Sequence, residues 1–110
     1  MFRIGGVPVT PGVFLRVGEP SISNSYTRAV ELGAITGKEA YREFWRKRRK
    51  VPNDWRDYTF LIPTEQGTWL VRYGGREWHR SLEKTNREFG ADCRLLFPRE
   101  QFVPQFVACV

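Results

Sequence analysis

The stretch TGKEAYREFWRKRRK, residues 36–50, combines the clearest helical pattern of the chain with most of its net charge. Thr36 followed three residues later by Glu39 is the pattern of a capping box, in which each side chain accepts a hydrogen bond from the other residue's backbone amide. Pro52 disfavours helical backbone at Val51, so the predicted helix ends near Lys50. Apolar residues recur between these signals at helical spacing, which predicts one buried side made of Ala40, Tyr41, Phe44 and Trp45.

Seven basic and two acidic residues give this stretch a charge of +5, out of +6 for the whole chain. Cations in the last turn complement the negative end of the helix dipole, so a solvated helix end is one interpretation. Five consecutive cations exceed that need because neighbouring like charges repel. The other interpretation is a continuous positive strip that binds an acidic partner. Its candidate contact residues are Arg42, Arg46, Lys47, Arg49 and Lys50, with the nearby aromatic residues Trp45 and Trp55.

Length and composition indicate a single domain over residues 1–110. The chain is 41% hydrophobic, 15% aromatic and 27% charged, which is typical of a soluble globular protein with one core. No run of 18 apolar residues is present, so no membrane-spanning helix and no membrane partner are expected. The first residues lack the continuous apolar segment of a secretory signal, and the cytoplasm is the expected location.

Before residue 36 the sequence predicts a small hairpin and a short helix. Residues 2–17 contain two extended segments, with turn signals at residues 5–6 and 11–12. The helix runs from Asn24 or Ser25 to Leu32 and is ended by Gly33. With the helix at 36–50 it is expected to form a helical hairpin, whose inner surface contains Tyr26, Val30, Ile35, Tyr41 and Phe44.

After Pro52 the sequence predicts two strands, a helix and a third strand. Residues 58–62 and 69–73 form a hairpin with a five-residue loop, and Trp69, Val71 and Tyr73 share one face of it. Residues 76–89 carry apolar positions at helical spacing and precede Gly90, which predicts a helix. Residues 93–97 form a core strand, and residues 101–110 form an edge strand or packed extension. The expected fold class is α+β, in the order ββααββαβ: a small antiparallel sheet with the helical hairpin and the further helix packed on one face.

The sequence offers little support for catalysis. His79, the only histidine, is flanked by carboxylates and arginines, so a small ribonuclease is conceivable. The same residues also match an exposed helix face with ion pairs, and we interpret the protein as non-enzymatic. No metal-binding motif or cofactor-binding motif is present. Cys93 and Cys109 match no zinc spacing and are expected to be reduced, although an oxidising compartment would permit a disulfide.

Two hypotheses of function remain. The first is a small binding protein that contacts nucleic acid, or a nucleoprotein complex, through the basic helix at 36–50. No RNA-recognition, homeodomain or zinc-finger signature accompanies it. The second is a protein–protein interaction module, such as a small inhibitor, accessory or assembly subunit, that docks onto an acidic protein. A phage or mobile-element origin fits so small a single-domain chain.

Overall fold

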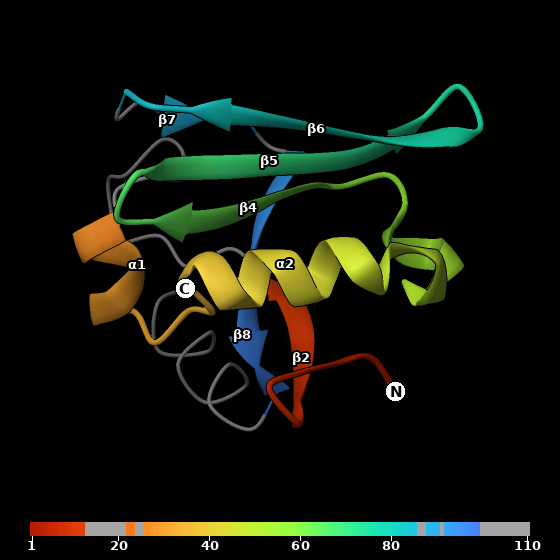
Figure 1. Cartoon of the computed structure of the whole chain (residues 1–110), viewed down its shortest axis with the longest axis horizontal. Coiled ribbons are helices and arrows are strands. Elements are labelled where there is room, and N and C mark those ends of the chain that lie inside the picture. Colours follow the sequence, from red (N-terminus) through yellow and green to blue (C-terminus); the bar gives the residue numbers. More distant parts are fainter. Residues whose placement is uncertain (13–21, 24–25, 86–87, 91, 100–110) are drawn as a thin grey trace.

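The computed structural model describes residues 1–12, 22–23, 26–85, 88–90 and 92–99, and these residues form mostly β-strands (Figure 1). The strands are β1 (Arg3–Ile4), β2 (Val7–Gly12), β3 (Ile22–Ser23), β4 (Thr59–Thr64), β5 (Gly67–Gly74), β6 (Glu77–Glu83), β7 (Glu88–Phe89) and β8 (Cys93–Pro98). The α-helices are α1 (Tyr26–Glu31) and α2 (Lys38–Arg46), and two 3-10 helices, η1 (Arg48–Lys50) and η2 (Asn53–Trp55), follow α2.

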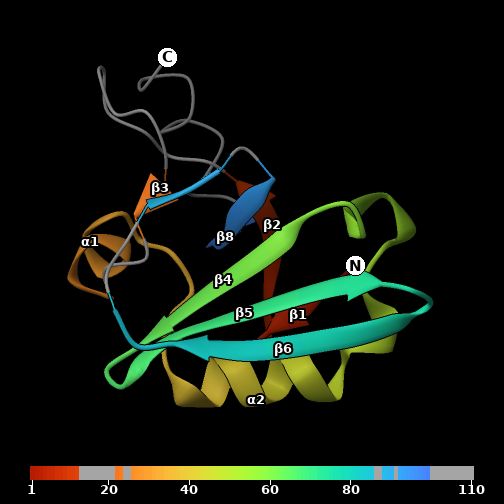
Figure 2. The same ribbon diagram turned by 90° about the horizontal axis from the view of Figure 1, so that it is seen from above.

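Six strands form one curled, mixed sheet in the order β1-β2-β8-β4-β5-β6. β4 and β8 pair in parallel, and the other neighbours in this sheet are antiparallel. The sheet bends into a half-barrel, because β4, β5 and β6 run across the direction of β2 and β8 (Figures 1 and 2). β3 and β7 pair separately as a two-stranded unit.

The sheet separates two apolar cores. The α2-side core consists of Phe2, Ile4, Val9, Tyr41, Phe44, Val51, Phe60, Ile62, Val71 and Leu96. The α1-side core consists of Ala29, Leu32, Leu61, Phe89, Cys93, Leu95 and Phe97. β4 supplies Phe60 and Ile62 to the first core and Leu61 to the second, and all three are 0% exposed. A strand buried on both faces needs no polar alternation, which explains the uninterrupted apolar run in β4.

The predicted helical hairpin is wrong. α1 contributes Ala29 to the α1-side core, whereas α2 contributes Phe44 to the α2-side core. The linker between the helices is bound to the sheet instead: the amides of Ile35 and Gly37 donate to carbonyls in β8 and β4, at 2.7 and 2.8 Å. Val30, predicted to lie inside the hairpin, is 50% exposed. The two helices therefore cover different faces of the sheet.

The predicted helix at 76–89 is also wrong, since these residues contain β6 and β7. Gly75 and Arg76 have φ values of 61° and 69° and form a two-residue turn that joins β5 to β6. Two left-handed residues match the twist of a tight hairpin. Trp78 and Leu82 are four residues apart, and an even separation also puts two residues on the same face of a strand. The predicted fold class, α+β in the order ββααββαβ, is therefore wrong. The predicted sheet is antiparallel, whereas the observed six-stranded sheet is mixed.

The hairpin predicted at 58–62 and 69–73 is confirmed as β4 and β5. Its loop is shorter than the predicted five residues, because β4 continues through Thr64, which pairs with Gly67. The predicted facing is also confirmed: Trp69 and Val71 pack in or against the α2-side core, whereas Leu70 packs against the other core. The strand predicted at 93–97 is confirmed as β8, and it lies in the middle of the sheet.

The helix predicted at 36–50 is confirmed as α2 followed by η1, but its capping box is wrong. Gly37 is the N-cap residue, with φ 103°, and no side chain caps the helix. The buried side is confirmed, with Tyr41 and Phe44 buried. The α-helix ends at Arg46, and the tighter η1 carries the chain to Lys50.

At the N-terminal end, the predicted turn at Gly5 and Gly6 is confirmed and joins β1 to β2. The predicted turn at Pro11 and Gly12 is wrong, because both residues belong to β2 and pair with β8. The segment 13–17, the tail 101–110 and Cys109 lie outside the described residues.

Candidate nucleic-acid interface

The basic residues predicted to form one strip are instead separated, and they lie in different places near η1. Lys47 and Lys50 line a hollow of about 360 Å³ beside Arg3. Arg49 lines a different hollow, of about 400 Å³, beside the β5–β6 turn. Arg46 is exposed on the last turn of α2. The basic run therefore does not present a single continuous strip.

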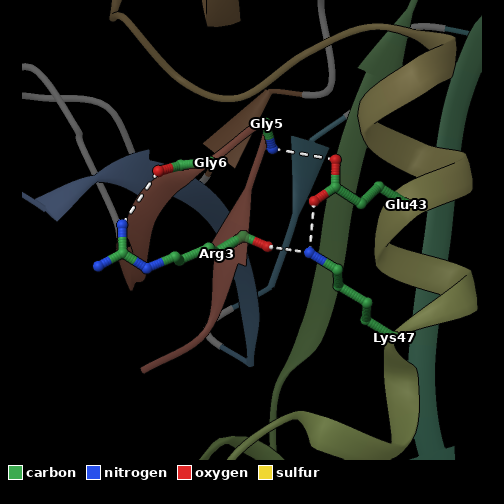
Figure 3. Close-up of polar contacts among 5 residues, drawn as sticks. All are labelled: Arg3, Gly5, Gly6, Glu43 and Lys47. Atoms are coloured by element: carbon green, nitrogen blue, oxygen red, sulfur yellow. Dashed lines mark hydrogen bonds and ion pairs between the residues drawn. The ribbon is translucent and has the colours of Figure 1, made fainter.

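Lys47 is neutralised by the protein itself (Figure 3). Its Nζ lies 2.7 Å from Oε2 of Glu43 and donates to the carbonyl of Arg3 at 3.2 Å. The other carboxylate oxygen of Glu43 accepts the amide of Gly5 at 3.0 Å. The ammonium group of Lys47 and then the Gly5 amide lower the pKa of Glu43 below its ordinary value of 4.5. Glu43 and Lys47 together therefore attach the β1–β2 turn to α2. Lys47 is consequently not available as a separate binding cation.

The remaining predicted cations are less constrained. Arg42 lies 3.6 Å from Glu39, in an ion pair whose side chains are both well exposed to solvent. Within the described residues, Arg46, Arg49 and Lys50 have no carboxylate within 4.0 Å. Exposed cations without a carboxylate partner retain their charge for an external anion.

Trp45 holds two arginines from different elements. The guanidinium carbons of Arg48 and Arg80 lie 4.2 and 4.5 Å from the centroid of its ring. Arg48 also donates to the carbonyl of Trp45 at 2.8 Å, and Arg80 donates to the hydroxyl of Tyr41 at 2.8 Å. Cation–π attraction thus gathers charge from η1 and β6 around one ring. Trp45 positions these arginines, and the cations over its ring compete with a nucleobase for the same face.

The hollow beside the β5–β6 turn adds further arginines. Its lining residues are Arg48, Arg49, Arg56, Tyr73, Arg76, Glu77 and Trp78. Because Arg48 belongs both to this lining and to the Trp45 group, the two form one neighbourhood. We call Arg48, Arg49, Arg56, Arg76 and Arg80 the arginine surface. Among the described residues that line the hollow, Glu77 is the only one with a carboxylate.

Trp55, the second predicted aromatic contact, packs against the α2-side core. Its ring makes edge and tilted contacts with Phe2 and Phe60, at centroid distances of 6.0 and 6.4 Å. The Trp55 ring therefore packs against the core, and Trp55 is not among the residues that line the hollow beside the β5–β6 turn.

His79 lies on the other face of the sheet, away from α2. With Arg72, Ser81, Asp92 and others it lines an open groove of about 430 Å³. Its Nε2 lies 2.9 Å from the carbonyl of Gly74 and 3.9 Å from Glu77. Within the described residues, no group of three or more His, Cys, Asp or Glu side chains could hold a metal ion. The helical cluster predicted around His79 is wrong, because strand alternation puts Arg80 on the face opposite His79.

No family model, curated protein or solved structure matches this chain. In the described part of the chain, no helix has both the length and the apolar character needed to cross a membrane.

Sequence reasoning missed Arg48, Arg56, Arg76 and Arg80 as members of this surface, and of these only Arg48 lies within the basic run. The helical pattern of residues 76–89 does not predict that Arg76 and Arg80 lie near η1. The dipeptide Gly75-Arg76 between two β-prone runs was the available signal, because a glycine there permits a tight hairpin turn. A hairpin at this point predicts that Arg80 shares a face with Val71, its partner in β5.

Proposed function

We propose that this protein is a non-enzymatic, cytoplasmic nucleic-acid-binding protein that contacts phosphates through the arginine surface and the adjoining Arg46. The observation that carries the proposal is that four arginines, from η1, the segment after η2 and the β5–β6 turn, line one hollow, and that Arg80 from β6 joins Arg48 of this hollow over the Trp45 ring. Arginine is suited to this role because its planar guanidinium group can donate two parallel hydrogen bonds to a phosphate.

Contacts of this kind position a nucleic-acid strand without reading its sequence. The aromatic residues of the surface are already occupied by guanidinium groups or by other rings, so charge supplies the affinity. An acidic protein is the alternative partner. The carboxylates of an acidic protein are spaced by its own fold, whereas phosphates recur along any nucleic-acid strand. A cluster of arginines, each able to donate to a phosphate, therefore favours nucleic acid as the partner.

The test is the salt dependence of binding to a short single-stranded oligonucleotide, measured by fluorescence anisotropy. If four phosphates are contacted, log affinity falls with log salt with a slope of about −3. The double variant Arg46→Gln/Arg49→Gln removes two exposed cations, and we expect its slope to be about half as steep.

The matched control is Arg72→Gln/Lys84→Gln, which removes the same net charge from positions outside the arginine surface. We expect it to retain nearly the wild-type slope. Equal effects of the two double variants would refute the proposed surface. Absence of oligonucleotide binding, together with a stoichiometric protein complex that survives nuclease treatment, would favour the acidic-protein alternative.

A further inference from the structure

The hollow beside the β5–β6 turn is built from parts of the chain that are distant in sequence. η1 and the residues after η2 supply Arg48, Arg49 and Arg56, and the turn supplies Arg76. Figures 1 and 2 both show the β5–β6 turn and the 3-10 segment at the same end of the molecule. The space they enclose has a volume of about 400 Å³.

Arg56 is fixed in this hollow by packing rather than by an ion pair. Its guanidinium carbon lies 4.5 Å from the centroid of the Tyr73 ring. Its Nε is buried and has no hydrogen-bond partner within the described residues. Buried polar groups are normally paired, and charged ones are normally neutralised. The charge of Arg56 is therefore held in a defined position and is not neutralised by a described carboxylate.

The aromatic residues of the hollow are unsuited to stacking on a base. The ring of Tyr73 is covered by Arg56 and meets the ring of Trp78 edge to face, with centroids 5.3 Å apart. Trp78 in turn packs against Phe44 of the α2-side core, at 6.4 Å. These rings support the arginines, so a ligand in the hollow is recognised by its charge.

The charge balance of the lining selects the kind of anion. Four arginines and one glutamate give a net charge of +3. The carboxylate of Glu77 is exposed at the rim, with 73% of its side chain accessible to solvent. A phosphodiester carries one negative charge, whereas a phosphate monoester carries about −1.5 to −2 near neutral pH. The monoester therefore balances more of the charge in the hollow.

We propose that this hollow binds one phosphate monoester, and that in a nucleic-acid ligand this group is the phosphate at a strand end. The inference deepens the proposed function and rests on it for the identity of the ligand. Arg49, Arg56 and Arg76 supply the donors. Arg48 contributes the remaining N–H groups of a guanidinium that already donates to the Trp45 carbonyl. Glu77 opposes binding because it repels the incoming anion.

The first experiment follows the Nε–H signal of Arg56 by two-dimensional NMR while inorganic phosphate is added at constant ionic strength. The buried Nε makes this signal a local probe of the hollow. We expect a saturable shift in the wild type. The variant Arg76→Asn removes one donor, and asparagine tolerates the left-handed backbone of the turn, where φ is 69°. We expect phosphate to bind about tenfold more weakly to Arg76→Asn and a few-fold more tightly to Glu77→Gln.

Arg72→Gln is the matched control, because it removes the same charge from the opposite face of the sheet. A saturable shift that is retained in this control and weakened in Arg76→Asn supports the site. A shift that does not saturate, or that is equally weakened in both variants, overturns it.

The second experiment compares one oligonucleotide with and without a 5′-phosphate. We expect the phosphorylated strand to bind about tenfold more tightly, and this preference to disappear in Arg76→Asn. Equal affinities would overturn the strand-end assignment. They would not decide the proposed function, which is tested separately by the salt dependence of oligonucleotide binding. A saturable shift with inorganic phosphate, without binding of either oligonucleotide, would support the hollow and refute the nucleic-acid function.

Discussion

Replacement of Glu43 by glutamine tests how the β1–β2 turn is attached to α2. The carboxylate accepts hydrogen bonds from the Gly5 amide at 3.0 Å and from Lys47 Nζ at 2.7 Å. Charge-assisted hydrogen bonds are about twice as strong as neutral ones, whose net contribution is about 1 kcal/mol. Glutamine keeps the shape and one oxygen acceptor but loses the charge, so each bond weakens by about 1 kcal/mol. Because 20% of the Glu43 side chain is exposed, solvent reduces the sum, and we expect a loss of about 1.5 kcal/mol.

Urea unfolding at several pH values measures this loss of stability and the direction in which it changes with pH. The pKa of Glu43 in the folded protein is lowered from 4.5, first by the hydrogen bond from Lys47 and then by the bond from Gly5. A carboxyl group with a lowered pKa contributes its full stabilisation above the unfolded value. We therefore expect the wild type to exceed Glu43→Gln in stability at pH 6–7. This difference is lost as the pH falls from about 4.5 through the lower folded-state pKa.

The control is Glu39→Gln on the same helix. The Glu39 side chain is 88% exposed and lies 3.6 Å from Arg42, so its loss should change the free energy of unfolding by less than about 0.5 kcal/mol. Equal losses in the two variants, or a loss in Glu43→Gln that does not decrease as the pH falls below 4.5, would refute the attachment through the Glu43 carboxylate.

Substitutions at two backbone positions are expected to change the free energy of unfolding in opposite directions. At Gly67 φ is 142°, and an added Cβ would lie 2.8 Å from the carbonyl oxygen of Glu83, so Gly67→Ala should lower the free energy of unfolding by about 2 kcal/mol, measured by urea titration. At Arg76 φ is 69° and further arginines lie nearby, so Arg76→Gly should relieve both backbone strain and like-charge repulsion. We expect it to raise the free energy of unfolding by about 0.5 kcal/mol, and a decrease would contradict this explanation.

Local signals predicted the elements that depend on their own residues. The apolar side of α2, the turn at Gly5 and Gly6, and the strands β4, β5 and β8 follow from periodicity and turn residues that lie within the element. β6 was mistaken for a helix because Trp78 and Leu82 satisfy both the helical and the strand period. The Gly75-Arg76 turn and the pairing of β6 with β5 show that the strand is correct.

Long-range pairing was not accessible from the sequence. The parallel pairing of β4 with β8, for example Leu61 with Leu95, depends on contacts between distant segments. Without it, the uninterrupted apolar run in β4 could not be recognised as a strand covered on both faces. The prediction of the site residues was incomplete for the same reason. The charge of residues 36–50 is evident in the sequence, but Arg49 shares the hollow with residues from the segment after η2 and from the β5–β6 turn.

The central position of β8 has a consequence for the way this protein is made. β8 lies between β2 and β4, although it follows both of them in the chain. During synthesis on the ribosome, β2 and β4 emerge with their inner edges unpaired, and exposed strand edges invite pairing with other chains. The half-barrel can close only after residues 93–98 have left the exit tunnel. Completion of the six-stranded sheet therefore follows translation of β8, and until then the inner edges of β2 and β4 are open to pairing with other chains.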